Sequence, residues 1–283
     1  MSQTVTEIRA MLAAHGLRPK KWLGQNFLID ANHLQRILDA AAIGRGDLVL
    51  EVGPGTGTLT VGLLEAGATV VAVEADEALE PLLAHHVGET YPDRFHLVIG
   101  DVLAGKHAIN PAVGEALADA AGETDPPFTL VANLPYQVAS PMLINFAVGW
   151  PNMTSAVVMV QREVADRMVS ESGGRTYGPL TIMVQAMCEV EVVSTLPPQA
   201  FWPAPQVSSA VVRLTRRADP LTDDPAALSA LVHQLFTRRR KTLGRILGRD
   251  HPLPEGVSHD DRPETLSVEQ VAQLATLTAG NGD

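Results

Sequence analysis

Short apolar runs and helical segments alternate along the first half of the chain. Four runs rich in Val, Leu and Ile occupy residues 47–52, 68–75, 95–101 and 128–133, and a segment suited to a helix follows each run. Continuous apolar strands that alternate with helices are typical of a parallel sheet covered by helices on both faces. The pattern therefore predicts an α/β fold with a doubly wound, Rossmann-like sheet.

Three further apolar runs predict additional strands, at residues 155–160, 188–196 and 208–214. The last two runs are joined by residues 196–207, a connection too rich in proline to form a helix, because proline lacks the backbone donor that a helix needs. The sheet is therefore expected to continue beyond its parallel part without a helical crossover at this point.

Three helices are expected outside this alternation. Residues 1–17 lack the long apolar core of a signal peptide and predict a short amphipathic helix. Apolar residues at helical spacing predict a second helix over residues 31–43. The stretch 104–127 is rich in Ala, Gly and acidic residues, which indicates one exposed helix within a variable loop.

The character of the chain changes after Arg217. Residues 218–226 form a polar, proline-containing linker, and residues 227–248 are expected to be helical. The stretch 263–280 predicts a final helix capped by Ser267. We see no internal repeat.

A chain of 283 residues suits one large domain or two modest ones. We predict a large α/β domain of residues 1–217, in which residues 1–30 form the N-terminal helix and a lid segment. Residues 218–283 are predicted to form a small helical domain.

The net charge of −11 argues against a basic surface over the whole protein, but the charges are unevenly distributed. Between residues 206 and 249, nine Arg and Lys residues stand against three Asp residues, so this tract can hold a polyanion locally. The one cysteine, Cys188, excludes an internal disulfide and indicates a reducing, cytoplasmic compartment. No uninterrupted apolar stretch approaches the roughly 18 residues of a membrane span.

A glycine-rich turn follows the first predicted strand. Glu51, Gly53, Gly55 and Gly57 stand at the exit of the strand and lead into a helix, where glycine permits a tight turn and a close approach of the backbone to a ligand. The last glycine comes one residue earlier than in the dinucleotide fingerprint. The spacing instead resembles the nucleotide turn of methyltransferases that bind S-adenosyl-L-methionine (SAM).

Two carboxylates end the next two predicted strands. Glu74 is placed to accept hydrogen bonds from a ribose diol, and Asp101 is placed to accept one from an adenine amino group. Each acid alone is an ordinary residue for a strand end. Their order at successive carboxyl ends, together with the glycine turn, predicts a nucleotide site in the crevice of the sheet.

The fourth strand leads into the sequence Asn-Leu-Pro-Tyr. An aromatic amine is a weak nucleophile because its lone pair is delocalised into the ring. The Asn133 side-chain oxygen and the Leu134 carbonyl could accept the two N–H bonds of such an amine and leave its lone pair free. Pro135 stiffens the loop, and Tyr136 offers a face for a base drawn out of its stack. These residues predict methyl transfer to adenine N6, in which catalysis rests on alignment and electrostatics.

Over nearly its whole length the chain resembles the ribosomal RNA adenine N6-dimethyltransferase family, in particular its bacterial small-subunit (16S) branch. The matching stretches are GQNFL at 24–28, EVGPGTGTLT at 51–60, VEAD at 73–76, GDVL at 100–103, NLPY at 133–136, QREVADRM at 161–168, YGPLTIMVQ at 177–185, FWPAPQVSSAVVRL at 201–214, TRRRKTLGRIL at 237–247 and RPETLSVEQVAQLA at 262–275. Thr237 stands where the family has asparagine, while the Arg-Arg-Lys-Thr sequence after it is kept.

The resemblance also implies roles for individual residues. Asn26 and Leu28 would contact the cofactor, with Gln25 beside them in the lid. Phe201 would stack on the target base opposite Tyr136; without the resemblance, its position favours core or loop packing. The residues implied in contacts with RNA phosphates are Arg238, Arg239, Arg240, Lys241 and Arg245.

The substrate that the resemblance implies is 16S rRNA in the immature small (30S) ribosomal subunit. Two neighbouring adenosines in the hairpin near its 3′ end would each be methylated twice, with SAM as cofactor and S-adenosyl-L-homocysteine as product. No metal, membrane or second subunit is expected.

Two alternatives to this function remain open. A large-subunit (23S) rRNA methyltransferase of the resistance type would share the crevice motifs, so only the stretch after Phe201 and the C-terminal segment favour the small subunit. A non-catalytic ribosome-assembly factor could keep the fold, although binding alone does not need the Asn133–Tyr136 sequence. A nicotinamide dehydrogenase is disfavoured by the glycine spacing.

Overall fold

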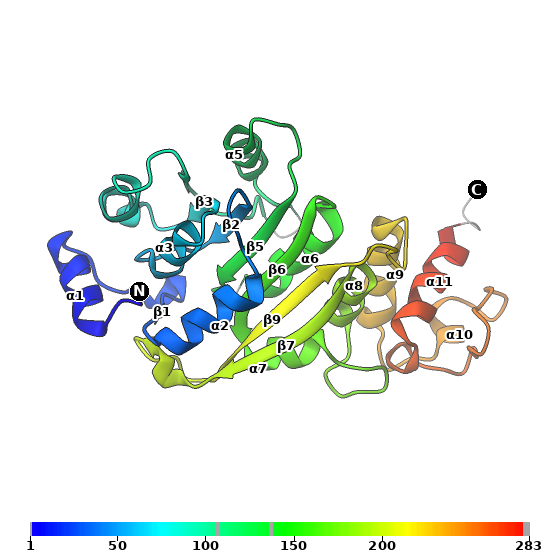
Figure 1. The fold of residues 1–283 in the computed structure, drawn as a ribbon. Coiled ribbons are helices and arrows are strands. Elements are labelled where there is room, and N and C mark those ends of the chain that lie inside the picture. The colour runs from blue at the N-terminus through cyan, green and yellow to red at the C-terminus, as the bar shows by residue number, and fades with distance from the viewer. Residues whose placement is uncertain (1, 106–107, 136–137, 280–283) are drawn as a thin grey trace.

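One mixed sheet of seven strands forms the centre of the molecule in the computed structural model, which describes residues 2–105, 108–135 and 138–279 (Figure 1). The strand order is β4–β3–β2–β5–β6–β9–β7. The strands are β2 (Leu48–Val52), β3 (Thr69–Glu74), β4 (Phe95–Ile99), β5 (Phe128–Asn133), β6 (Met153–Gln161), β7 (Cys188–Leu196) and β9 (Ser209–Arg216). All seven predicted strands are therefore confirmed.

The first five strands of this order run parallel, whereas β9 pairs antiparallel with both β6 and β7. The chain leaves β2 toward β3 on one side and later returns as β5 on the other side. In doubly wound sheets such a reversal opens a crevice at the carboxyl ends of the strands, where ligands bind. The predicted doubly wound α/β class is confirmed.

Helices cover both faces of the sheet because its strands are apolar on both sides. Val49 and Val70 pack in one hydrophobic cluster, together with α2 (Ala31–Ala41), α3 (Thr58–Glu65) and α4 (Glu80–Leu83). Leu50 and Val71 point to the opposite face and pack in the other cluster. The helices there are α5 (Pro111–Ala121), α6 (Ala139–Gly149), α7 (Arg162–Met168) and α8 (Pro179–Met187).

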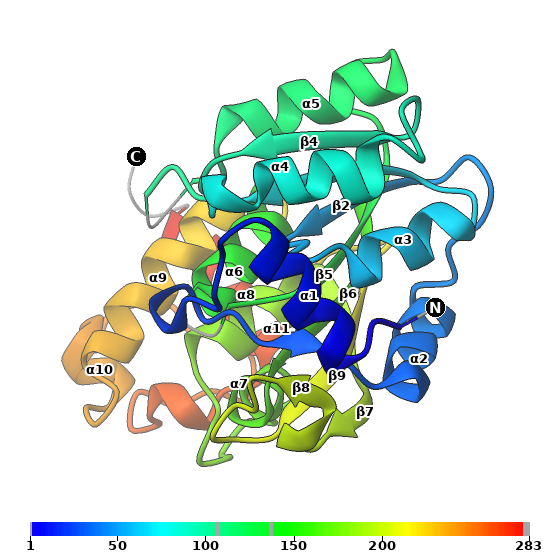
Figure 2. The ribbon, with the colours of Figure 1, turned by 90° about the vertical axis from the view of Figure 1, so that its left-hand side faces the viewer.

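The N-terminal helix α1 (Val5–Ala14) is held by a capping box between Thr4 and Glu7 and buries Ile8 and Leu12. After it, β1 (Phe27–Leu28) pairs antiparallel with β8 (Phe201–Trp202), a strand of the proline-rich connection (Figure 2). The sequence does not predict this two-stranded pairing, because its partners are far apart in the chain. It joins the predicted lid segment to the connection between β7 and β9.

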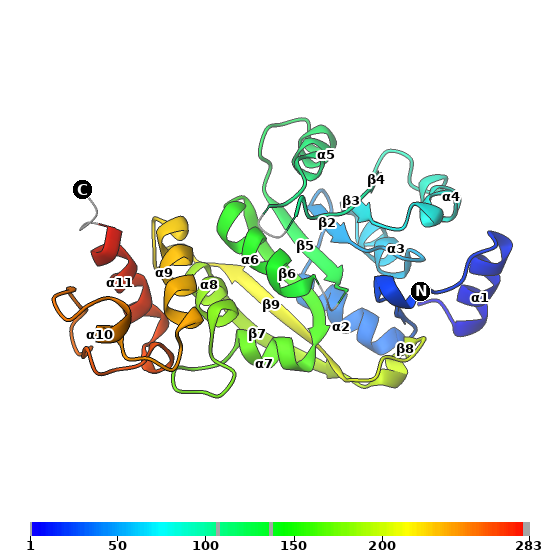
Figure 3. The same cartoon turned by 180° about the vertical axis from the view of Figure 1, so that it is seen from behind.

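The C-terminal helices gather at the end of the molecule opposite α1 (Figures 1 and 3). They are α9 (Pro225–Thr237), α10 (Leu243–Ile246) and α11 (Val268–Ala279). Ser267 caps α11: its hydroxyl accepts from the Gln270 N–H at 3.2 Å, and the Gln270 side chain accepts from the Ser267 N–H at 2.9 Å. This confirms the predicted cap.

The prediction of one helix over residues 227–248 is wrong. The helix α9 ends at Thr237, and Arg238 leaves the helical region with φ −116° and ψ 29°. Beyond the turn, the Leu243 and Gly244 N–H groups donate to carbonyls of residues 261 and 259, each at 2.8 Å. These tertiary bonds redirect the chain although no glycine or proline stands between residues 237 and 244.

The apolar core continues across the predicted domain boundary at residue 217, since Leu228 and Leu231 of α9 belong to the same cluster as Ile182 of α8. The boundary itself stays a prediction. Within the residues that the structure describes, no helix is both long and apolar enough to cross a membrane.

Candidate cofactor and active site

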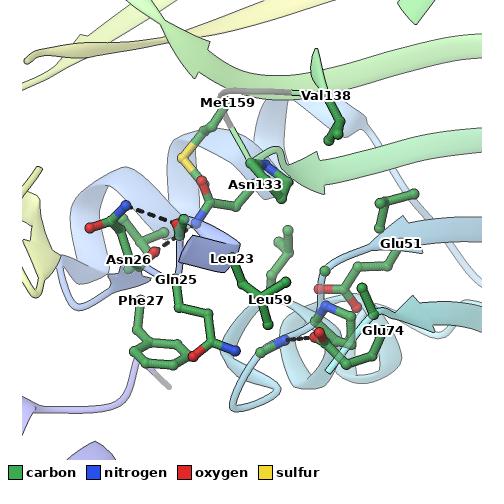
Figure 4. A pocket seen from close by; sticks show the side chains of 18 of the residues that line it. Leu23, Gln25, Asn26, Phe27, Glu51, Leu59, Glu74, Asn133, Val138 and Met159 are labelled. Carbon is green, nitrogen blue, oxygen red and sulfur yellow. Dashed lines mark hydrogen bonds between the residues drawn. The ribbon is translucent and has the colours of Figure 1, made fainter. Parts of the chain in front are cut away.

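A cavity of about 620 Å³ opens at the carboxyl ends of β2, β3 and β5, where the strand order reverses (Figure 4). Glu51 and Glu74 lie on one side of it, and Asn133 and Met159 lie on the other. The predicted site residues that line the cavity are Gln25, Asn26, Leu28, Glu51, Gly53, Gly55, Glu74, Asp101, Asn133 and Pro135. The fold thus brings the predicted nucleotide residues and the predicted amine acceptor together.

The glycine turn has a backbone that other residues adopt only with strain. Gly55 has φ +60°, and a Cβ at this position would lie 3.0 Å from the Phe27 ring. Gly57 has φ +83°, and its Cβ would lie 2.8 Å from Cγ2 of Val87. Gly57 is not among the residues that line the cavity; it closes the turn by donating to the Pro54 carbonyl at 2.9 Å. Its contribution is therefore to the backbone path and not to ligand contact.

The Glu74 carboxylate is fixed at the end of β3 by two backbone donors. One oxygen accepts from the Gly55 N–H at 3.1 Å, and the other accepts from the Asp76 N–H at 2.9 Å. Burial raises the pKa of Glu74, and these hydrogen bonds act against that rise. The acid is thereby held against the glycine turn, where its remaining lone pairs can accept from a ligand hydroxyl.

Glu51 is the most unusual group in the cavity. Its side chain is only 1% exposed, and Oε2 has no hydrogen-bond partner among the described residues. Burial raises the pKa of Glu51 to about 8, with a smaller contribution from the negative charge of Glu74. A buried carboxylate oxygen without a partner is costly, and a cationic group of a ligand would satisfy it.

Asp101 lies in the loop after β4 and is exposed. One carboxylate oxygen accepts from the Leu103 N–H at 2.9 Å, and the Asp101 carbonyl accepts from the Asn110 side chain at 3.1 Å. These bonds order the loop at the cavity edge. The side chain therefore lies at the edge of the cavity, and its contact with adenine stays a prediction.

Asn133 ends β5 beside Met159 of β6. Its Nδ2 atom donates to the Asn26 carbonyl at 2.9 Å, and the next residue, Leu134, donates its N–H to the Met159 carbonyl at 3.0 Å. Pro135 lines the cavity, and Tyr136 lies outside the described residues. The amide is therefore fixed by its nitrogen end, and the acceptor role of Oδ1 stays a prediction.

The predicted lid segment is tied to the sheet by Asp76. Lys20 Nζ lies 2.6 Å from one carboxylate oxygen, and Gln25 Nε2 donates to the other at 2.8 Å. The Gln25 side-chain oxygen in turn accepts from the Lys20 N–H at 2.8 Å. Burial acts to raise the pKa of Asp76, but the Lys20 and Gln25 hydrogen bonds hold it below its usual value. Gln25 thus lines the cavity with both ends of its amide already bonded.

Phe201 lies away from the cavity surface. It is 3% exposed, pairs with Leu28 across β1 and β8, and belongs to the hydrophobic core. It is not among the residues that line the cavity. Its stacking on a target base stays a prediction.

Several cavity residues were not predicted from the sequence. Met159 and Gln161 lie at the carboxyl end of β6, the strand beside β5, which carries Asn133. Their position at the end of an apolar run could have identified them. Other lining residues come from the lid and the proline-rich connection and do not stand at the end of a predicted strand. They are Trp22, Leu23, Pro205, Gln206 and Val207.

The basic tract divides into two parts with different surroundings. On β9, Arg216 donates to the carbonyls of residues 146, 147, 150 and 153, between the end of α6 and the start of β6, so it is a structural residue. In the turn after α9, Arg239 pairs with Glu264 at 3.0 Å. The remaining predicted RNA-contact residues are exposed: Arg238, Arg240, Lys241 and Arg245.

No cluster of three or more His, Cys, Asp or Glu side chains with the arrangement of a metal site occurs among the described residues. Cys188 is buried, and burial raises the pKa of its thiol. This cysteine lies at the start of β7.

Known proteins resemble this chain in sequence, and solved structures resemble it in fold. Small-subunit rRNA methyltransferase A of Dinoroseobacter shibae is 41% identical, with 96% of each chain covered. The protein of the same name from Streptomyces avermitilis is 38% identical, with 95% of this chain and 91% of the relative covered.

Solved structures agree with these relatives. A dimethyladenosine transferase from Plasmodium falciparum superposes with a TM-score of 0.71 at 26% identity, covering 90% of this chain and 98% of that one. The 23S rRNA methyltransferase ErmE has a TM-score of 0.66 at 27% identity, with 89% and 99% covered. The family described as Ribosomal RNA adenine dimethylase matches residues 16–279. The resemblance drawn from the motifs is confirmed: this chain belongs to the ribosomal RNA adenine dimethylase family.

Proposed function

We propose that this protein transfers methyl groups from SAM to N6 of two neighbouring adenosines in the 16S rRNA of the small ribosomal subunit, as a step in ribosome biogenesis. The observation that carries the proposal is one cavity with a nucleotide-type half, formed by Glu51, Glu74 and the glycine turn, and an amide acceptor, Asn133, on the facing side. Family membership supports the same reaction class.

The cavity residues fit SAM. The partnerless oxygen of buried Glu51 suits the α-ammonium group of the cofactor, and the fixed carboxylate of Glu74 suits the ribose hydroxyls. Asp101 would accept from the adenine amino group, while the backbone near Gly53 and Gly55 would approach the cofactor closely. Gln25, Asn26 and Leu28 would close the site from the lid. The bound cofactor would supply an electrophilic methyl group and leave as S-adenosyl-L-homocysteine; no metal is needed.

The acceptor side of the cavity would hold an adenine amine. Asn133 Oδ1 and the Leu134 carbonyl would accept the two N–H bonds, which orients the nitrogen lone pair toward the cofactor and opposes its delocalisation. Pro135 would keep this loop rigid, and Tyr136 would stack on the base. Phe201, which is 3% exposed in this structure, would have to become exposed to stack on the base as well. Most of the rate enhancement would come from this alignment, since an N6-methylated ammonium is acidic enough to lose its proton to water.

The RNA partner would be held by charge at the opposite end of the protein from α1. Arg238, Arg240, Lys241 and Arg245 are exposed, and Arg239 orders the turn that carries them through Glu264. Contacts of this kind would position an immature 30S particle by its phosphates and shape. The protein would act in the cytoplasm, and a single copy of the chain would supply every residue that the reaction uses.

The test is tritium transfer from labelled SAM to undermethylated small ribosomal subunits, with large subunits in parallel, followed by nucleoside analysis. The expected product is N6,N6-dimethyladenosine in small-subunit RNA alone. Label in the large subunit would move the activity to the resistance-type reaction. SAM binding without transfer to either subunit would favour an assembly factor.

A further inference from the structure

The mouth of the cavity carries exposed apolar side chains. Trp22 is 72% exposed and Val207 is 45% exposed, and both line the cavity. Among the described residues, the other two exposed large apolar side chains, Val169 and Leu277, do not line it. A tryptophan this exposed is uncommon, and its position beside a binding site indicates a contact made by the bound partner.

The backbone beneath Trp22 is fixed. Residues Lys21–Leu23 form a single 3₁₀ turn, which Gly24 closes by donating to the Lys21 carbonyl at 3.0 Å. Lys20, directly before the turn, is the residue paired with Asp76. The exposed ring therefore projects from an anchored turn, and the backbone of this turn loses little conformational freedom when the ring binds a partner.

The same turn lies against the loop that follows Asn133. A Cβ placed on Gly24 would lie 3.6 Å from Cβ of Pro135, so the two loops are in van der Waals proximity. Two cations stand close to Trp22 in the sequence: Arg18 and Lys21 are exposed, and neither has an ion-pair partner within the described residues. An aromatic face beside unpaired cations is typical of surfaces that bind unstacked nucleotides.

We infer that Trp22 is a stacking platform for an unpaired RNA base next to the adenosine that enters the cavity. This inference rests on the proposed RNA substrate. When one base leaves its stack to reach an active site, its neighbour loses a stacking partner. Trp22 replaces that partner, Arg18 and Lys21 attract the adjacent phosphates, and Val207 adds apolar contact on the rim. Trp22 is a positioning residue for the reaction at Asn133.

The test compares Trp22→Ala and Trp22→Phe, with Val169→Ala as a control at an exposed apolar residue away from the cavity. Loss of the ring should raise the KM for undermethylated small subunits by about tenfold or more, and phenylalanine should restore part of the loss. SAM affinity, measured by calorimetry, should stay unchanged. An unchanged KM, or a parallel loss of SAM affinity, would overturn the inference that Trp22 stacks on an RNA base.

Fluorescence tests the contact without turnover. The probes are an RNA hairpin with an unpaired adenosine-containing loop and a blunt duplex of the same composition. The hairpin should quench tryptophan emission in the wild-type protein more than in Trp22→Phe, and the duplex should not. Equal quenching in both proteins would contradict the inference. Quenching without methyl transfer to any subunit would keep the platform and reject the proposed reaction, so the two failures are distinguishable.

Discussion

The Asn133 side chain donates from Nδ2 to the backbone carbonyl of Asn26 at 2.9 Å. This bond joins the carboxyl end of β5 to the segment immediately before β1, two parts of the chain that lie 107 positions apart. It also sets the orientation of the amide, because only the nitrogen end can face a carbonyl oxygen. The lid segment and the predicted amine acceptor are therefore joined by a direct hydrogen bond.

Asn133→Asp should abolish the fixed orientation of this side chain while keeping its size and shape. A carboxylate cannot donate, and its oxygen would face the Asn26 carbonyl, so transfer should fall by about 10²–10³ in kcat. SAM affinity should change by less than about tenfold, because a neutral hydrogen bond contributes roughly 1 kcal/mol. Single-turnover transfer and calorimetric SAM binding measure the two effects separately.

The matched control is Asn152→Asp. Asn152 makes a similar side-chain bond, to the Pro126 carbonyl at 2.9 Å, but it does not line the cavity. Its loss should leave kcat close to that of the wild type. Equal loss of SAM binding and transfer in Asn133→Asp would reject the assigned role of this amide.

Glu51 should link stability to pH in the cofactor-free protein. Its pKa is raised from the usual 4.5 to about 8, so the folded state binds the proton more tightly than the unfolded state. The resulting stabilisation is fully present below about pH 4.5 and is lost as the pH rises through about 8. The melting temperature of Glu51→Gln, relative to that of the wild type, should therefore rise as the pH is raised from 6 to 9. Glu115→Gln, an exposed acid on α5, should show no such trend.

The same group should release a proton when SAM binds. If the cofactor ammonium pairs with ionised Glu51, a carboxyl that is mostly protonated at pH 7 must lose its proton. Calorimetry at pH 7 in buffers of different ionisation enthalpy should detect the release in the wild type and a smaller one in Glu51→Gln. Identical proton release in both proteins would show that Glu51 does not face the ammonium group.

Asp76→Asn should loosen the lid segment. The ion pair with Lys20 would be lost and the bond from Gln25 weakened, at a cost of about 1–3 kcal/mol in unfolding free energy at neutral pH. Because the pKa of Asp76 is lowered in the folded state, its stabilisation is present above the usual value of 3.8 and is lost as the pH falls through the folded value. In strong acid the free energy of unfolding of the wild type should therefore approach that of Asp76→Asn.

Hydrogen exchange locates the effect of this change. Amides of residues 20–26 should exchange faster in Asp76→Asn, whereas those of α9 should not. Asp93→Asn, at an exposed acid in the turn before β4, serves as the control. Unchanged exchange in residues 20–26 would mean that the β1–β8 pairing, and not Asp76, holds the lid.

Much of the fold follows from local sequence. The seven strands were predictable because each is a short apolar run bounded by polar residues or glycine, and their alternation with helices required a parallel sheet. The convergence of polar side chains at strand ends was predictable for the same reason. Glu51, Glu74 and Asn133 stand at the ends of buried runs, and parallel strands bring their carboxyl ends to one edge.

Features that depend on contacts between distant segments were not predictable. The rim formed by Trp22 and Val207 requires the β1–β8 pairing, which no local pattern encodes. The end of α9 at Thr237 was missed because no glycine or proline follows it before Gly244, while backbone bonds to residues 259 and 261 redirect the chain. Tertiary contacts outweigh helix propensity in such cases.

The basic turn after α9 provides a test of RNA contact in which stability and binding can be separated. Arg239 pairs with Glu264, so Arg239→Glu would place two negative charges together and disturb the fold. Arg238 and Arg240 are exposed and have no ion-pair partner in the part of the chain that the structure describes. The double change Arg238→Glu with Arg240→Glu should therefore weaken binding to small subunits while the melting temperature stays close to that of the wild type.

The salt dependence of binding identifies the cause of this loss. Each phosphate contact that is removed should reduce the slope of log K against log salt by about 1. Arg36→Glu, an exposed arginine on α2, controls for the general change in charge and should leave the slope unchanged. If the double variant binds more weakly with an unchanged slope, the loss does not come from phosphate contacts, and the two arginines lie outside the RNA interface. A lower slope with an intact fold would place the turn on the phosphate backbone.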